Sequence, residues 1–396
     1  MSIDTARFLR KRDGEEARVT YVELFFDLIY AFAVTQLSHR LIHDLSALGA
    51  LQTLILWFAV WLGWQYTCWV TNWFDPERIQ VRLLLFAVML VAMVMSASLP
   101  LAWSTRGLVF AISYVTIQVG RTLVVLRFLG RRHALTANFQ RICGWLAISG
   151  LAWIAGGLLD GTPRFICWSV AVLCEYLSPM FGFPLPGLGR SRPEDWRTAE
   201  GGHIAERCQA FVILALGESV LMTGGTWSDI AAWSAPATIA FLVCFLGSVA
   251  MWWVYFDTSS RAGSHAIVRS KEQGLMAAYF HYVHVILVAG IIVSAAADDL
   301  VILHPDQRIA WSTAWLLMGG PAIYIVGNGF YKRIVYGWFP LSHWIGVGLL
   351  AMLAPLAFHT DLLMTGALTT VIMIVVAAWE SVSRRTSPRA TEVRAE

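Results

Sequence analysis

Charged residues are scarce in this chain. Of its 396 residues, 14% are Asp, Glu, Lys or Arg and 57% are hydrophobic, whereas soluble domains carry about 25% charged residues. The mean hydropathy of +0.61 and the 19 tryptophans are typical of a polytopic membrane protein, in which Trp and Tyr gather at the two membrane interfaces. The composition therefore argues against an ordinary soluble domain.

Sequence signals for several functional classes are also missing. No polybasic tract or zinc-finger spacing is present, so we expect no nucleic-acid partner. G-x-S-x-G, H-E-x-x-H and a long hydrophilic domain are absent as well, so we do not expect an enzyme. The six cysteines form no C-x-x-C pair, and we interpret them as small buried hydrophobic residues. We predict no cofactor and no metal site.

Long apolar runs are abundant. A membrane-spanning helix needs about 20 apolar residues at a rise of about 1.5 Å per residue, and the sequence offers twelve such runs. We therefore predict an all-α polytopic membrane protein with about twelve transmembrane helices. The expected spans are 22–42, 50–71, 81–99, 107–127, 139–157, 164–181, 204–224, 233–256, 274–296, 309–330, 341–357 and 361–380.

The positive charges predict the orientation of these spans. With the N-terminus inside, 23 of the 29 Lys and Arg residues fall on the cytoplasmic side, four fall outside and two lie within spans. An excess of positive charge marks cytoplasmic loops, so we expect both termini, an arm (1–21) and a tail (381–396), in the cytoplasm. This assignment places Lys332 on the cytoplasmic side, Arg164 on the outer side at the start of its span, and Asp298 in an outer loop.

The two halves of the sequence resemble each other. "YVELFFDLIYAFAVTQL" (21–37) aligns with "IAERCQAFVILALGESV" (204–220), and Glu175 of the sixth span aligns with Glu380 of the twelfth. Because six spans per half is an even number, we expect both halves to share one orientation, as in parallel-repeat transporters. The expected domains are a first six-helix repeat (22–181), a cytoplasmic linker (182–203) and a second six-helix repeat (204–380).

Ionisable residues within the first-half spans are candidates for function. Glu23 and Asp27 share one helix face, which should point into the protein because a carboxylate exposed to lipid costs on the order of several kcal/mol. Arg121 and Glu175 lie at a depth similar to that of Asp27, and we expect these three to form one ion-paired layer, functional or purely structural. Glu23 and Glu206 have the alternative role of stabilising helix starts, where acids are favourable.

The second half places its ionisable residues differently. His203, Arg207 and Glu218 fall within a narrow arc of one helix. In the alignment of the two halves, Asp27 corresponds to Ala210 and Thr35 corresponds to Glu218. The acid of the first half, Asp27, and the acid of the second half, Glu218, therefore lie at different depths in the membrane. Such a stagger would suit a proton or cation path at the repeat interface.

The ninth predicted span contains a histidine pair, His281 and His284, three residues apart. Buried histidines suit proton relay because they titrate near neutral pH. The alternative is packing with hydrogen bonding, since two possible ligands without a third are weak evidence for a metal site.

Three motifs carry a resemblance to a known family. The stretches "ELFFDLIYAFAVTQLS", "HIAERCQAFVILALGESVL" and "YFHYVHVILVAGI" resemble the bacterial low temperature requirement A (LtrA) family, and the resemblance extends over nearly the whole chain. It implies a polytopic protein of the bacterial cytoplasmic (inner) membrane, in a family named for a growth defect in the cold whose biochemical activity is not established. The positions that match the family motifs are Glu23, Phe26, Asp27, Thr35, His203, Glu206, Arg207, Gly217 and Glu218.

Twelve spans, a parallel repeat and acids within spans favour a secondary transporter or permease coupled to protons or another cation. In this hypothesis Asp27 and Glu218 carry protons or ions, while Arg121 and Arg207 modulate their protonation or hold an anionic substrate group. The candidate pathway residues are Glu23, Asp27, Thr35, Arg121, Glu175, His203, Glu206, Arg207, Glu218, His281 and His284.

Two alternatives stay open. One is an ion channel with the first and seventh helices lining the pore. The other is a membrane scaffold or enzyme needed for growth at low temperature. In each case the expected partners are the lipid bilayer, an unidentified small molecule or ion, and a second copy of the chain in a homodimer.

Overall fold

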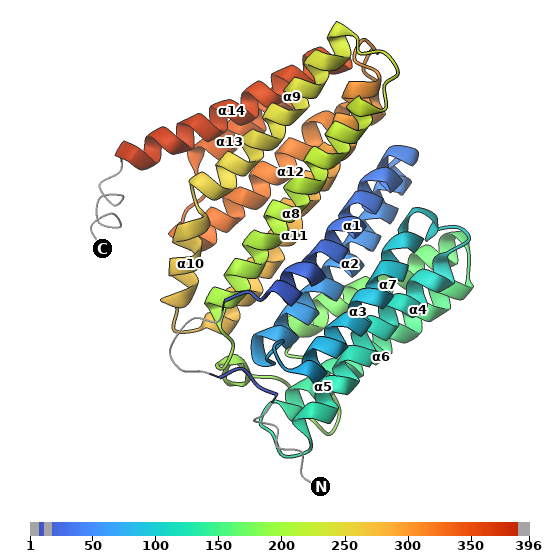
Figure 1. Cartoon of the computed structure of the whole chain (residues 1–396), viewed down its shortest axis with the longest axis vertical. Helices are drawn as coiled ribbons and strands as arrows, with labels where there is room; N and C mark the ends of the chain where they lie inside the picture. Colours follow the sequence, from blue (N-terminus) through green and yellow to red (C-terminus); the bar gives the residue numbers. More distant parts are fainter. Residues whose placement is uncertain (1–7, 12–17, 387–396) are drawn as a thin grey trace. The chain divides into compact units, whose positions relative to one another are not determined.

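The computed structural model describes residues 8–11 and 18–386 (Figure 1). Within these ranges the regular elements are all helical, which confirms the predicted all-α class. Predictions for the rest of the arm and tail, including Arg7 and Arg12, lie outside the described residues. The α-helices are α1 (Tyr21–His43), α2 (Ala47–Trp73), α3 (Ile79–Ser98), α4 (Gly107–Val115), α5 (Arg121–Leu129), α6 (Thr136–Leu158), α7 (Gly161–Met180), α8 (Gly201–Ser228), α9 (Ala235–Trp252), α10 (Ser260–Val268), α11 (Gln273–Leu303), α12 (Trp311–Tyr336), α13 (Leu341–Ala357) and α14 (Leu362–Thr386).

Nine helical stretches in the described part of the chain are long and apolar enough to cross a membrane. Two of them contain a π-helical segment, η3 (Thr116–Gly120) between α4 and α5 and η5 (Trp253–Asp257) after α9. The predicted spans 164–181, 309–330 and 341–357 correspond to α7, α12 and α13, which are helical but are not among the nine. The count of twelve spans therefore stays a prediction.

Two helices, α11 and α12, extend beyond their predicted spans, which corrects the loop assignment of Asp298. Asp298 lies within α11 and not in an outer loop. Lys332 lies within α12, where its Nζ is 2.7 Å from a carboxylate oxygen of Glu380. Arg164 is buried in the first turns of α7, and its guanidinium donates to main-chain carbonyl oxygens 2.8–3.1 Å away. Lys332 and Arg164 can continue their helices because their side chains find partners inside the protein.

The described residues form two compact units. The first contains the described residues up to Arg40, then Ala47–Ala210 and Val268–Ala278. The second contains Leu41–Ser46, Phe211–Ile267 and the described residues from Tyr279 onward. Each unit has its own helix packing and its own buried polar clusters.

In the first unit, α6 packs against α4 and α7, and α3 packs against α4, as Figure 1 shows. α2 supplies a row of buried tryptophans. Trp57, Trp61 and Trp64 are at most 2% exposed, with ring centroids of successive pairs 5.4 and 4.7 Å apart. These tryptophans are therefore packing residues and not part of an interfacial belt.

In the second unit, α9 packs against α14, and α12 and α14 both pack against α13. Glycines bring α11 and α12 together. A Cβ added at Gly290 would lie 2.5 Å from the backbone N of Tyr324, and one at Gly327 would lie 2.7 Å from the backbone N of Leu287. Membrane helices commonly use small residues in this way, because the gain comes from close backbone packing.

We expect Gly290→Ala to lower the free energy of unfolding by about 1–3 kcal/mol, because the added methyl group overlaps the backbone of α12. Thermal unfolding in detergent, followed by tryptophan fluorescence, measures the change. Gly348→Ala on α13 is the matched control, since no atom lies within 4 Å of its added Cβ. Its midpoint should stay level or rise slightly through helix propensity. Equal midpoints for the two variants would contradict the close α11–α12 packing.

Candidate functional site: a buried charge network

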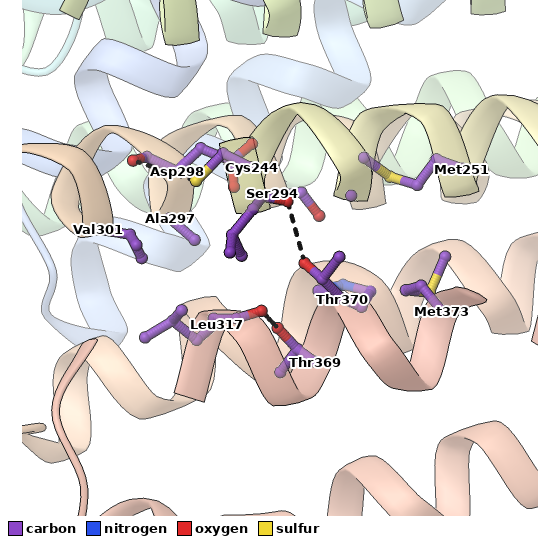
Figure 2. A pocket seen from close by; sticks show the side chains of 14 residues that line it. Cys244, Met251, Ser294, Ala297, Asp298, Val301, Leu317, Thr369, Thr370 and Met373 are labelled. Carbon is purple, nitrogen blue, oxygen red and sulfur yellow. Dashed lines mark hydrogen bonds between the residues drawn. The ribbon is translucent and has the colours of Figure 1, made fainter. Parts of the chain in front are cut away.

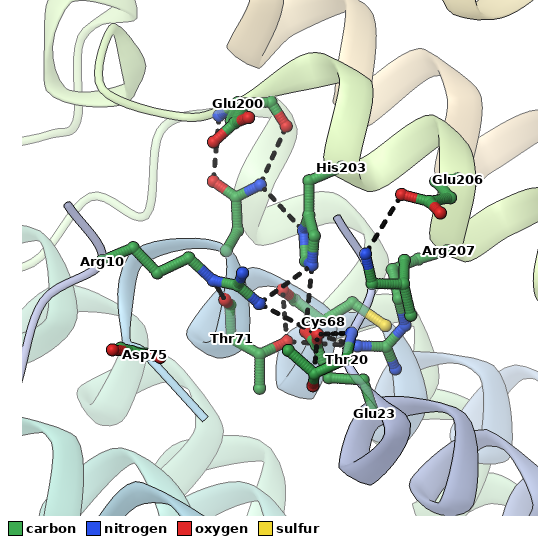
Figure 3. A network of polar contacts seen from close by, with 12 residues as sticks. Arg10, Thr20, Glu23, Cys68, Thr71, Asp75, Glu200, His203, Glu206 and Arg207 are labelled. Carbon is green, nitrogen blue, oxygen red and sulfur yellow. Dashed lines mark hydrogen bonds and ion pairs between the residues drawn. The ribbon is translucent and has the colours of Figure 1, made fainter. Parts of the chain in front are cut away.

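Glu23 is the centre of a cluster of charged side chains in the first unit (Figure 3). Its Oε2 accepts hydrogen bonds from the backbone N–H and the hydroxyl of Thr20, both at 2.9 Å, which completes one side of a capping box at the start of α1. Oε2 also accepts from Arg10 Nη2 at 2.9 Å. Oε1 accepts from His203 Nε2 at 2.9 Å and Arg207 Nη1 at 3.0 Å. The carboxylate thus has donors on both oxygens.

Asp27 lies one turn further along α1, on the same face. Its Oδ1 accepts from Trp64 Nε1 at 2.6 Å and from Arg207 Nη2 at 2.5 Å, while Oδ2 accepts from Arg207 Nε at 3.1 Å. Asp27, Trp64 and Arg207 are all 0% exposed. The Asp27–Arg207 pair is bidentate, a geometry that adds both energy and directional specificity.

Arg207 joins the two carboxylates from the first turns of α8. In addition to Glu23 and Asp27, it donates to the Thr71 hydroxyl at 3.2 Å. The guanidinium also lies 5.7 Å from the ring centroid of Phe26 and 6.0 Å from that of Trp64. A planar guanidinium can make these contacts at once, whereas the compact ammonium of lysine cannot.

The hydrogen bonds around His203 determine its tautomer. The backbone N–H of Glu200 donates to Asn72 Oδ1 at 2.9 Å. Asn72 Nδ2 therefore faces the Glu200 carbonyl at 2.8 Å and His203 Nδ1 at 3.2 Å. Because Nδ1 accepts this bond, Nε2 carries the proton donated to Glu23, and His203 is neutral in this arrangement.

The N-terminal arm supplies a second guanidinium, that of Arg10. The arm is attached to the end of α2 by a bridge between Leu9 and Phe74 and by a 2.9 Å bond from the Arg10 N–H to the Trp73 carbonyl. Arg10 Nε donates to the Thr71 carbonyl at 2.7 Å. With Arg10 and Arg207 opposite two carboxylates, the network has no net charge.

Neutrality explains how these residues can be buried. A charged residue at the centre of a membrane helix costs about 2.5–3.5 kcal/mol on insertion scales, and ion pairing with complete hydrogen bonding offsets much of that cost. The chain thus brings together four of the predicted pathway residues: Glu23, Asp27, His203 and Arg207.

Arg10, Trp64 and Thr71 also belong to this network and were not predicted from the sequence. The T-x-x-E spacing of Thr20 and Glu23 is a sequence signal for the cap. No comparable signal identifies Arg10, because its contact with Glu23 depends on the path of the arm across α2.

The ion-paired layer predicted from Asp27, Arg121 and Glu175 is wrong, because each side chain has other partners. Arg121 is 2% exposed and follows the π-helical segment η3. Its Nη1 donates to the Thr67 hydroxyl at 2.9 Å, and its Nη2 donates to Gln118 Oε1 at 2.6 Å. The guanidinium is therefore surrounded by neutral oxygen atoms rather than carboxylates.

Glu175 on α7 lies in a separate polar cluster of the first unit. Its Oε1 accepts from the Ser149 hydroxyl at 2.6 Å and from Trp153 Nε1 at 3.0 Å. Its Oε2 accepts from the Tyr114 hydroxyl. Neutral donors hold this carboxyl group on both oxygens.

Three further predicted residues lie away from the network or in the other unit. Glu206 is exposed and accepts the backbone N–H of Val19, just before α1, at 3.1 Å; it lies in the second turn of α8 and not in the first turn, where the predicted role at the start of its own helix would place it. Thr35 is half-buried, and its hydroxyl lies 3.4 Å from the Ala31 carbonyl oxygen. Glu218 is half-buried and belongs to the second unit.

His281 and His284 are both buried in the second unit. His284 Nε2 lies 2.7 Å from the Tyr255 hydroxyl, and Nδ1 lies 2.6 Å from the Phe280 carbonyl oxygen. Since a main-chain carbonyl can only accept, Nδ1 carries the proton and Nε2 accepts from the tyrosine. In the described part of the chain, no group of three His, Cys, Asp or Glu side chains could hold a metal ion.

Comparisons with known proteins cover nearly the whole chain. The family model described as "Bacterial low temperature requirement A protein (LtrA)" matches residues 18–378. An uncharacterized protein of Rhizobium meliloti (strain 1021) is 38% identical over 386 residues, which cover 97% of this chain and 94% of the relative. No solved structure matches. The family match includes Glu23, Asp27, His203 and Arg207, whereas Arg10 precedes it.

The network generates a prediction about charge balance. Arg207→Met or Asp27→Asn alone leaves one unbalanced buried charge, and each should destabilise the protein by about 3–5 kcal/mol. The double variant keeps the neutral Glu23–Arg10 pair, so its loss should be clearly smaller than the sum of the two single losses. Thermal unfolding in detergent measures all three variants.

Glu206→Gln on the same helix is the control. Its side chain is exposed and keeps an acceptor oxygen, so the change in stability should stay within about 0.5 kcal/mol. Strict additivity of Arg207→Met and Asp27→Asn would show that the two side chains are not energetically coupled.

Proposed function

The chain belongs to the bacterial low temperature requirement A (LtrA) family, and from this premise we propose that it is a secondary transporter coupled to protons or another cation. The observation that carries the proposal is the closed, neutral network around Arg207, set among helices apolar enough to cross a membrane. Buried ionisable groups in membrane helices are expensive and generally serve ion or proton pathways.

Protonation would change the network in a defined way. A proton on Asp27 weakens both of its contacts with Arg207 and gives the network one net positive charge. Leaving a buried charge without its partner costs about 3–5 kcal/mol. The protein can avoid this cost by binding an anion beside Arg207 or by moving the guanidinium toward water. Proton binding would thereby be coupled to a ligand or to a conformational change.

The position of the network gives protons a route to it. Glu23 lies in the first turn of α1 and His203 is the third residue of α8, so the network lies at the start of both helices. The side chain of Arg10 is 9% exposed, whereas Glu23 is fully buried behind it. In the orientation inferred from the positive charges, this end would face the cytoplasm, with both termini on that side of the inner membrane.

We also propose twelve spans arranged as two parallel six-helix repeats. The sixth helix of each proposed repeat carries a buried or largely buried glutamate, Glu175 in α7 and Glu380 in α14. In both units this glutamate contacts the fourth and fifth helices of its own repeat. The partners are Tyr114 and Ser149 for Glu175, and Lys332 and Ser342 for Glu380. The two glutamates thus occupy equivalent helices and contact equivalent helices, which supports a common origin of the two halves.

Proton flux into proteoliposomes tests the proposal. The purified protein is reconstituted with an entrapped pH-sensitive dye, and a pH gradient is imposed. We expect protein-dependent proton flux that Asp27→Asn and Glu218→Gln each reduce to the level of protein-free liposomes. Asp27→Glu keeps the carboxylate and should retain flux, and Glu206→Gln should match the wild type.

Each variant is first checked for wild-type elution and helical content, so that lost flux is not lost fold. Undiminished flux in both Asp27→Asn and Glu218→Gln would disprove the proposed mechanism. Unitary currents in planar bilayers would show that the protein is an ion channel and not a transporter.

A further inference from the structure

The second unit contains a small pocket between α9, α11, α12 and α14 (Figure 2). Its cavity volume is about 30 Å³. A single buried water needs about 10–15 Å³ measured in this way, so the pocket holds one or two species of that size. An amino acid or a lipid headgroup does not fit. All the residues that line the pocket belong to the second unit.

Two oxygen donors come from one face of α11. Ser294 is 5% exposed, and its hydroxyl has no hydrogen-bond partner among the described residues. Asp298 follows one turn later and also lines the pocket. Among the described residues, no Lys or Arg side chain forms an ion pair with Asp298. A carboxylate without a cation and a buried hydroxyl without a partner therefore lie side by side, one turn apart.

Two further helices of the pocket, α12 and α14, supply neutral oxygen atoms. Pro321 lies inside the continuous helix α12 and has no N–H, so the carbonyl of Leu317 lacks its usual helical donor. Both residues line the pocket. On α14, Thr369 and Thr370 donate their hydroxyl hydrogens to main-chain carbonyls at 2.9 and 3.4 Å, which leaves oxygen lone pairs free to accept. Figure 2 shows Ser294 and Thr370 at the same cavity from opposite helices.

We propose that this pocket binds one small monovalent cation, with Na⁺ as the ligand. Carboxylate, carbonyl and hydroxyl oxygens are hard ligands and favour hard cations. One carboxylate balances one positive charge, whereas a divalent ion would leave a net charge buried between apolar helices. Main-chain carbonyls without a helical donor coordinate Na⁺ in other membrane proteins, and the Leu317 carbonyl is such a group.

The sulfur atoms that line the pocket do not make it a site for a soft metal. Cys244 and Met251 both come from α9, but they are seven residues apart. This spacing corresponds to about 10.5 Å along a helix, so the two sulfur atoms cannot ligate the same ion. The oxygen donors, in contrast, come from facing turns of three helices.

The proposed binding site does not depend on the proposed transport function. A role of Na⁺ as the coupling ion, in contrast, rests on that transport function. Binding is therefore tested without flux, by thermal unfolding in detergent at constant ionic strength. Choline chloride is replaced stepwise by NaCl, or by KCl in a parallel series. A ligand that binds only the folded state raises the unfolding midpoint as its concentration rises. We expect a saturating rise with Na⁺ and a smaller one with K⁺.

Asp298→Asn and Ser294→Ala should both lose the Na⁺-dependent rise. Asp299→Asn is the matched control, because this neighbouring carboxylate accepts a hydrogen bond from Thr226 and is not part of the pocket lining. Direct binding of radioactive ²²Na⁺ to each purified variant gives a readout that does not depend on its stability.

Three results would overturn the inference. They are equal midpoints in NaCl and choline chloride for the wild type, full ²²Na⁺ binding by Asp298→Asn, and an equal rise with KCl. Na⁺ binding without any flux in proteoliposomes would leave the site standing and remove the transport function. Proton flux without Na⁺ binding would leave the transport function standing and remove the Na⁺ site.

Discussion

The first unit depends on one guanidinium shared between two carboxylates. Arg207 donates to Glu23 and to Asp27, and through them it connects α8, α1, α2 and the N-terminal arm. None of these groups is stable in an apolar interior alone, because an unpaired charge there costs several times more than a lost neutral hydrogen bond. The network therefore holds as a whole, and its neutrality is a condition of the fold.

The other buried polar groups solve the same problem with different chemistry. Arg121 is surrounded by hydroxyl, amide and carbonyl oxygens, while Glu175 is held by hydroxyl and indole donors. Lys332 and Glu380 pair directly in the second unit. Asp298 differs from all of these, because it lies beside a cavity to which the described residues contribute no cationic side chain. Within this chain, Asp298 is thus the acid whose surroundings best suit a bound cation.

The helical class, most apolar spans and four members of the network follow from the sequence, because hydropathy and the spacing of Glu23 and Asp27 are local signals. What could not be predicted depends on distant contacts. Arg207 bonds to Asp27 across 180 positions, and the direction of that pairing is set by packing. The extended ends of α11 and α12 were missed because Asp298 and Lys332 look like loop residues until their surroundings are known.

The long separation between Asp27 and Arg207 also has a consequence for synthesis of the protein. The carboxylate leaves the ribosome 180 residues before the guanidinium that neutralises it. At about 5–20 residues per second, this interval lasts on the order of ten to forty seconds. During that time Asp27 is without the guanidinium that neutralises it in the folded protein. The pairing of α1 with α8 can therefore form only after the start of α8 has been synthesised.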